Sequence, residues 1–250
     1  MRDRCWTVIK EDGNMVSAKQ APRLVLLSVT CEDGYITLNA PEMKALRIPV
    51  ELPSTNSVWN CRRFGIEAQG RDCGDEAAQW ITTFMNMVPC RLVHYEANML
   101  TRKPGDFLPA FPPTDEVAYA EGSPILLISE ASLEDLNNRL EKKVAITNFR
   151  PNILVTDCSP YEEDAWVEIL IGNVELKGRM SCPRCVFTTI DPDTGIMNGK
   201  EPLKTLKSYR KCDPSEQHDF KNNPPFGWLY GIDKTGIVEV GDPVKQPQIW

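Results

Sequence analysis

The chain has 250 residues, enough for one large domain or two small ones, and its 42% hydrophobic content supports a packed core rather than global disorder. Its formal net charge of −7 argues against nucleic acid as a partner, because nucleic acid attracts basic surfaces. No apolar run approaches the ~20 residues that span a bilayer, and no signal peptide opens the chain.

The nine cysteines are odd in number and scattered from Cys5 to Cys212. A disulfide framework favours an even number of cysteines in a shorter chain. We therefore expect free thiols, a soluble chain and a reducing compartment.

The first part of the chain is rich in predicted strands, because β-branched and aromatic residues cluster in short runs. Glu32-Asp33-Gly34 predicts a hairpin turn between two of them. Apolar residues recur at three- and four-residue spacing over Asp75 to Met87, which predicts a helix that Pro89 ends. The expected strands are Trp6 to Ile9, Leu24 to Thr30, Tyr35 to Leu38, Ala45 to Val50 and Arg91 to Tyr95.

A proline-rich loop from Thr101 to Thr114 indicates a boundary, after which strands and short helices follow. Ser132-Leu133-Glu134-Asp135 resembles a capping box for a helix that extends to Val144, and Leu203, Leu206 and Tyr209 mark a short helix. With no βαβ alternation, the predicted architecture is β-rich α+β with barrel-like sheets. The expected strands are Ile125 to Ser129, Asn152 to Thr156, a hairpin from Leu170 to Leu176 turning at Gly172-Asn173, Trp228 to Ile232 and Ile237 to Val240.

The most informative motif is Cys182-Pro183-Arg184-Cys185. The residues after Cys185 are β-branched and aromatic, which predicts a strand that begins at Cys185, next to the fixed charge of Arg184. A redox dithiol usually lies at a helix N-terminus, where the helix dipole lowers the thiol pKa. A thiolate at a strand start beside an arginine is better suited to bind a soft metal.

Other interpretations of this pair remain open. Cys182, Cys185, Cys212 and His218 are four potential zinc ligands, although their spacing is longer than in common zinc motifs. A dithiol redox motif is a second alternative, and two buried thiols that act as small hydrophobic residues are a third.

Two further segments are candidates for anion binding. Asn148-Phe149-Arg150-Pro151-Asn152 combines a guanidinium fork and an amide in a turn that proline stiffens, which suits a phosphate or a heterocycle edge. Glu121-Gly122-Ser123-Pro124 precedes an apolar strand, and its hydroxyl and amides are suited to an anion. For each segment, an ordinary surface turn is the simpler interpretation.

Taken together, these segments resemble one family along nearly the whole chain. The chain is similar to the mitochondrial amidoxime-reducing components, molybdenum enzymes built on the MOSC domain. The matching segments are Gly13 to Leu24, Gly70 to Gly74, Glu130 to Leu133, Asn148 to Asn152, Met180 to Cys185, Asp191 to Gly195, Thr205 to Arg210 and Val240 to Val244.

The resemblance implies an N-terminal β-barrel region over residues 1–95 and a MOSC domain over residues 99–247. It also implies that Cys185 is the molybdenum ligand and the catalytic residue, and that a molybdopterin cofactor is bound by Arg4, Gly122, Ser123, Arg150, Asn152, Pro183, Arg184 and Cys185. In the family a strand and a membrane anchor precede the position of Arg4, so we expect a chain shortened at its start.

The implied activity is reduction of N-hydroxylated compounds, such as amidoximes and hydroxylamines, with nitrite as a further candidate substrate. Electrons come from NADH through cytochrome b5 reductase and cytochrome b5, at the mitochondrial outer membrane facing the cytosol. The metal carries the redox chemistry while the protein supplies ligation and orientation. Neither zinc nor a pyridoxal phosphate domain is expected. The alternatives are a sulfur-carrying MOSC module related to molybdenum cofactor sulfurase, or a cofactor-binding module without activity.

Overall fold

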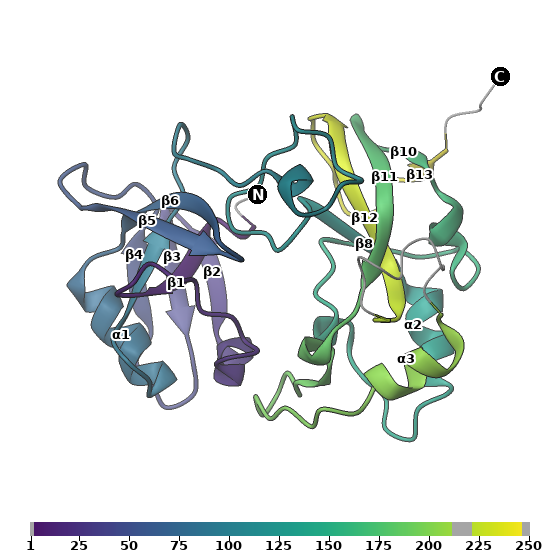
Figure 1. The fold of residues 1–250 in the computed structure, drawn as a ribbon, viewed down its shortest axis with the longest axis horizontal. Coiled ribbons are helices and arrows are strands. Elements are labelled where there is room, and N and C mark those ends of the chain that lie inside the picture. Colours follow the sequence, from purple (N-terminus) through teal and green to yellow (C-terminus); the bar gives the residue numbers. More distant parts are fainter. Residues whose placement is uncertain (1–2, 212–221, 247–250) are drawn as a thin grey trace. The chain divides into compact units, whose positions relative to one another are not determined.

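The computed structural model describes residues 3–211 and 222–246, so Cys212 and His218 of the zinc hypothesis lie outside the described residues. The chain divides into two compact units (Figure 1). Unit 1 comprises residues 1–102, 117–120 and 191–197, and unit 2 comprises the remainder. No helix among the described residues is long and apolar enough to cross a membrane.

Unit 1 contains two antiparallel sheets and one α-helix. The four-stranded sheet has the order β1-β7-β6-β5, with bounds β1 Trp6–Lys10, β5 Val58–Arg63, β6 Ile66–Asp72 and β7 Cys90–His94. The three-stranded sheet has the order β2-β3-β4, with bounds β2 Ser28–Glu32, β3 Tyr35–Asn39 and β4 Leu46–Pro49.

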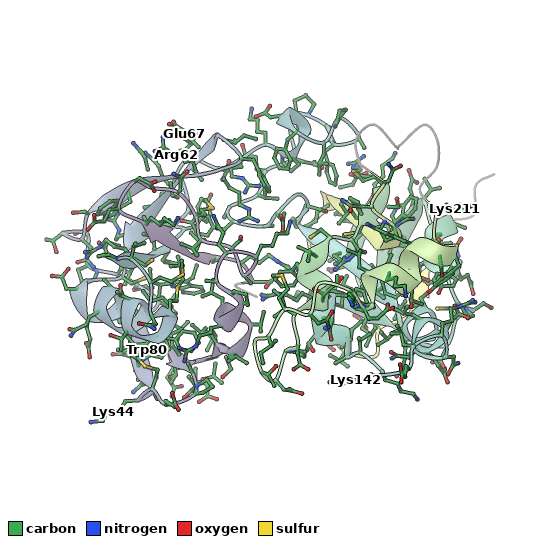
Figure 2. The ribbon with its side chains drawn as sticks, turned by 60° about the horizontal axis from the view of Figure 1, so that its bottom comes forward. Lys44, Arg62, Glu67, Trp80, Lys142 and Lys211 are labelled. Carbon is green, nitrogen blue, oxygen red and sulfur yellow. The ribbon has the colours of Figure 1, made fainter. Side chains whose placement is uncertain are left out.

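Helix α1 spans Asp75–Met85 and buries one apolar face in the core of unit 1. Its buried residues, Ala77, Trp80, Ile81, Phe84 and Met85, follow the predicted spacing. The Nε1 of Trp80 donates to the carbonyl oxygen of Lys44 at 2.7 Å, which ties the helix to the segment before β4 (Figure 2). The helix ends at Asn86, whose left-handed conformation closes it before Pro89 is reached.

Unit 2 is built on a six-stranded sheet with the order β13-β10-β11-β12-β8-β9. Neighbouring strands are antiparallel except β8 and β9, which are parallel and are connected through helix α2. The expectation of no βαβ connection is therefore wrong at this one place. The strand bounds are β8 Ile125–Ser129, β9 Ile153–Val155, β10 Glu168–Ile171, β11 Val174–Pro183, β12 Pro225–Lys234 and β13 Val244–Lys245.

Two α-helices pack at the same end of this sheet (Figure 1). They are α2, Glu130–Asn137, and α3, Leu203–Tyr209. Their apolar residues, Leu136 and Leu206 among them, share one core with Phe149 and Phe226. The 3-10 helices of the chain are η1 Pro22–Leu26, η2 Pro104–Asp106, η3 Ile146–Asn148, η4 Glu162–Ala165 and η5 Val186–Thr189.

The β-rich α+β class is confirmed, and so is the hairpin between β2 and β3. The predicted strand Leu24 to Thr30 is wrong in its first half, because Pro22 presets the φ angle for η1 and the strand begins only at Ser28. The hairpin of β5 and β6 was not predicted, since its turn at Phe64-Gly65 joins segments broken by polar and glycine residues.

Three further local predictions are wrong. The N-cap of α2 is Ser129 rather than Ser132, and Ser129 Oγ accepts from the backbone N of Ser132 at 3.0 Å. The helix ends at Asn137 rather than Val144, because the Asn137 side chain bonds to the backbone of Val144. Ile237 to Val240 form no strand, and the backbone N of Ile237 donates to Asn173 Oδ1 at 2.7 Å. The segment after Cys185 is η5 rather than a strand.

Candidate functional site

Cys185 lies between the end of β11 and the beginning of η5. Its carbonyl oxygen accepts from the backbone N of Thr188 at 3.1 Å and from Thr188 Oγ1 at 3.0 Å, which turns the chain into η5. These local bonds explain why a β-branched run became a 3-10 helix. The Cys185 thiol is half-buried and makes no hydrogen bond among the described residues. Its partial exposure is compatible with a ligand role.

Arg184 is the buried cation of this region, with 6% of its surface exposed. Its Nη1 donates to Cys182 Sγ at 3.0 Å, its Nη2 donates to the carbonyl oxygen of Phe149 at 2.7 Å, and its guanidinium lies 5.3 Å from the centre of the Phe149 ring. Burial raises the pKa of the Cys182 thiol, and the Arg184 charge opposes that rise. Arg184 thus holds Cys182 and the Phe149 turn together.

Asn148 forms a second connection between the same two segments. Its Nδ2 donates to the carbonyl oxygens of Thr188 at 3.1 Å and Ile190 at 3.0 Å, and the side chain is buried. The segment on each side of Cys185 is therefore anchored to the turn that carries Arg150. Sequence reasoning did not assign this role to Asn148, because the acceptors are backbone atoms 40 residues or more away.

Arg150 itself is exposed and has a left-handed backbone, with φ of 53°. For a non-glycine residue this conformation costs about 1–2 kcal/mol, and Pro151 restricts it further. The bonds of Asn148 and the carbonyl of Phe149 hold the turn on its N-terminal side. A strained residue that surrounding structure maintains is a reason to suspect function.

Pro183 ends β11, opposite Pro225 on β12, and the backbone N of Arg184 donates to the carbonyl oxygen of Pro224 at 2.9 Å. Proline at this position removes a backbone donor and fixes φ, which makes the approach to Cys185 rigid. Pairing between β11 and β12 thus holds the chain up to Pro183, and Cys185 lies just beyond the last paired residue.

Ser123 precedes β8 and Asn152 precedes β9, and both side chains bond to residues at the beginning of β8. Ser123 Oγ donates to the carbonyl oxygen of Tyr230 at 2.8 Å and is 3.0 Å from that of Ile125. Asn152 Oδ1 accepts from the backbone N of Leu126 at 2.8 Å, and the backbone N of Asn152 donates to the carbonyl oxygen of Leu126. These side-chain atoms are used to hold strands together, so the loop offers an anion mainly its backbone amides. Gly122 is closely packed, since a Cβ there would approach Leu108 Cδ1 to 2.7 Å.

Unit 2 therefore brings together the Cys182–Cys185 segment and the Arg150 turn, with Asn152 linking that turn to the start of β8. Arg4 belongs to unit 1, where it has a φ of 53° and pairs with Asp3. Its contribution to a site in unit 2 stays a prediction.

The set of donors restricts the kind of metal that fits. Within residues 3–211 and 222–246, no group of three or more His, Cys, Asp and Glu side chains could hold a metal ion. One accessible thiol, a buried guanidinium and an exposed arginine suit a soft metal carried by an anionic cofactor.

Comparison with known proteins identifies the family of the chain. The MOSC domain model matches residues 114–245, and the MOSC N-terminal beta barrel domain model matches residues 1–88. Mitochondrial amidoxime reducing component 2 of Bos taurus is 55% identical over 98% of this chain and 73% of its own length. The human component 1 is 54% identical, over 98% and 72%. The chain belongs to the mitochondrial amidoxime-reducing component family.

A more distant member has the same extent of match. Component 1 of Danio rerio is 49% identical over 98% of this chain and 74% of its own length. Membership in the amidoxime-reducing family, together with the MOSC domain, supports a molybdenum-related reductase. All three relatives are named mitochondrial proteins.

Proposed function

We propose that this protein reduces N-hydroxylated compounds with a molybdenum–molybdopterin cofactor that Cys185 binds through its thiolate. The observation that carries the proposal is the half-buried Cys185 thiol without a hydrogen-bond partner in the described structure, held beside buried Arg184 in a chain of this family. The substrates are amidoximes and hydroxylamines, with nitrite as a further candidate.

The residues of the chain bind and position the cofactor. Arg150 offers a guanidinium fork for its phosphate, and the backbone amides of Gly122 and Ser123 offer further donors. Arg184, through Cys182 and Phe149, fixes the segment that carries the ligand. Asn152, Pro183 and Arg4 complete the proposed set. When bound, the cofactor supplies two-electron chemistry: an amidoxime, two electrons and two protons give an amidine and water.

The proposed electron source is NADH, through cytochrome b5 reductase and cytochrome b5. The proposed location is the mitochondrial outer membrane, facing the cytosol. Both rest on the resemblance to the family, whose named members support a redox enzyme that takes electrons from partners.

The test is metal and pterin analysis of the purified protein, combined with reduction of an aromatic amidoxime by a chemical reductant. We expect one molybdenum and one pterin per chain, and amidine formation that Cys185→Ser abolishes. A purified protein that contains neither molybdenum nor pterin would contradict the proposal. Cofactor without reduction, together with a persulfide on a cysteine, would favour the sulfur-carrying alternative.

A further inference from the structure

The segment from Lys200 to Lys211, which contains α3, has a charge opposite to that of the rest of the chain. It carries five basic residues and one acidic residue, a net charge of +4. Since the whole chain has −7, the other residues together carry −11. Opposite charge concentrated in one short segment of an acidic protein is a feature that steers association.

The lysines of this segment are exposed and lack ion-pair partners within the part of the chain that the structure describes. Lys200, Lys204, Lys207 and Lys211 are exposed, and none forms an ion pair with another described residue. Figure 2 labels Lys211 at the end of the segment. Unlike these lysines, the two nearby arginines form ion pairs. Arg210 pairs with Asp164, and the guanidinium of Arg139 donates to the two carboxylate oxygens of Asp135 at 2.9 Å and 3.0 Å. The unpaired charge is therefore that of the lysines.

The opposite face of α3 packs onto the residues around the cysteine pair. Leu206 is fully buried in one core with Met180, Phe149 and Phe226, and Cys182 packs against the same core. Side chains in contact connect α3 to Arg184: Tyr209 Oη is 2.8 Å from Tyr161 Oη, the Tyr161 and Phe226 rings are 6.4 Å apart, and the Phe226 and Phe149 rings are 4.6 Å apart. Arg184 lies on Phe149 and donates to Cys182.

We propose that the lysine face of α3, formed by Lys200, Lys204, Lys207 and Lys211, is the docking surface for an acidic electron-donor protein. Electron transfer between proteins slows steeply as the distance between donor and acceptor groups increases. A protein bound at this face is separated from Cys182 by a single packed core. Complementary charge also raises the association rate between the proteins. This inference rests on the proposed function, because it assigns a place to the electron donor of that reaction.

The test compares two double variants of the full chain that change the net charge equally. Lys204→Glu with Lys207→Glu reverses the charge of the α3 face. Lys19→Glu with Lys44→Glu reverses two exposed lysines in unit 1, which also form no ion pair with a described residue; Lys44 is labelled in Figure 2. The probe is the soluble haem domain of cytochrome b5, and the measurement is its association rate constant at several salt concentrations.

We expect the α3 variant to lower the association rate constant about tenfold at low salt, with the difference shrinking as salt screens the charges. The unit 1 variant should remain within about twofold of the wild type. Turnover driven by the haem domain should fall in the α3 variant, while turnover driven by a chemical reductant should not change. Equal association rates in all three proteins, or an equal loss in the two variants, would overturn the docking surface. If the cofactor-loaded wild type showed no turnover with the chemical reductant, that result would count against the proposed function. The association rates would still decide the docking surface.

Discussion

The cysteines of the two units differ in their surroundings and in their burial. In unit 1, Cys61 and Cys90 are buried within apolar cores, and Cys73 packs against one of them. Burial raises the pKa of Cys61 to about 11 and that of Cys73 to about 12. In unit 2, Cys182 accepts from a buried guanidinium and Cys185 follows it at the end of a strand.

This difference indicates what separates an inert thiol from a ligand. An apolar core keeps a thiol protonated, so it acts as a small hydrophobic residue. The Cys182–Cys185 segment instead combines a buried cation with a thiol that is half-exposed and not hydrogen-bonded in the described part of the chain. Cysteine spacing alone does not distinguish these cases, but the direct hydrogen bond from Arg184 to Cys182 and the partial exposure of Cys185 do.

The largest expected effect tests the ligand. Cys185→Ser should lower amidoxime reduction more than about a hundredfold, since even outer-shell partners of metal ligands are worth about 10–100-fold, and a hydroxyl is a poor ligand for a soft metal. Cys182→Ser should keep most activity, because a serine Oγ can still accept from Arg184. Cys61→Ser in unit 1 should alter stability only. Steady-state rates per folded protein measure the activity of all three variants. Equal losses in Cys185→Ser and Cys182→Ser would support a dithiol or a pair of ligands instead.

The next effect tests whether Arg184 positions the site. Arg184→Met leaves the Phe149 carbonyl without its donor and removes the contact with the Phe149 ring, which should cost about 2–4 kcal/mol of unfolding free energy. The pterin content per folded chain should fall as well, because the segment before Cys185 loses its connection to the Arg150 turn and only the Asn148 connection after Cys185 is left.

The matched control is Arg71→Met in unit 1. Arg71 binds Glu96 with 2.9 Å distances and donates to the carbonyl oxygens of Ser54 and Asn56, so its loss should also destabilise the protein. Pterin content per folded chain should then remain that of the wild type. If the two variants lost pterin equally, general destabilisation would explain the effect of Arg184.

A smaller effect is expected at Arg150. Arg150→Ala and Arg150→Gly both remove the guanidinium, and loss of one charge-assisted hydrogen bond should weaken cofactor retention about 10–100-fold. Only glycine relieves the left-handed backbone, so Arg150→Gly should be about 1 kcal/mol more stable than Arg150→Ala. Pterin release during dialysis and denaturant unfolding measure the two effects. Retention equal to the wild type in both variants would remove Arg150 from the site.

The sequence was most informative where side chains interact locally. The spacing in α1 and the Asp33-Gly34 turn predicted their elements well, because the residues that decide them are neighbours in the chain. Prediction was wrong where local and distant bonds act together: Val186 to Thr189 looks like a strand, but Thr188 bonds back to Cys185 and Asn148 holds the carbonyl oxygen of Thr188, so the run forms η5. In the same way the resemblance made Arg184 a candidate site residue, while its contact with Phe149 could be seen only in the fold.

The smallest expected effect tests whether the buried Cys61 thiol of unit 1 stays protonated in the folded protein. The folded protein keeps the Cys61 thiol neutral up to about pH 11, whereas the unfolded chain ionises near its ordinary pKa of 9.0. Cys61 therefore contributes stability that is fully present below pH 9 and is lost as pH rises toward 11. The difference in unfolding free energy between the wild type and Cys61→Ala should shrink by about 1 kcal/mol between pH 8 and pH 10. Denaturant unfolding at both pH values measures it, with Cys31→Ala as the control because Cys31 is exposed. A difference that does not change with pH would mean that Cys61 ionises alike in the folded and unfolded states, and unit 1 would then hold a reactive thiol as well.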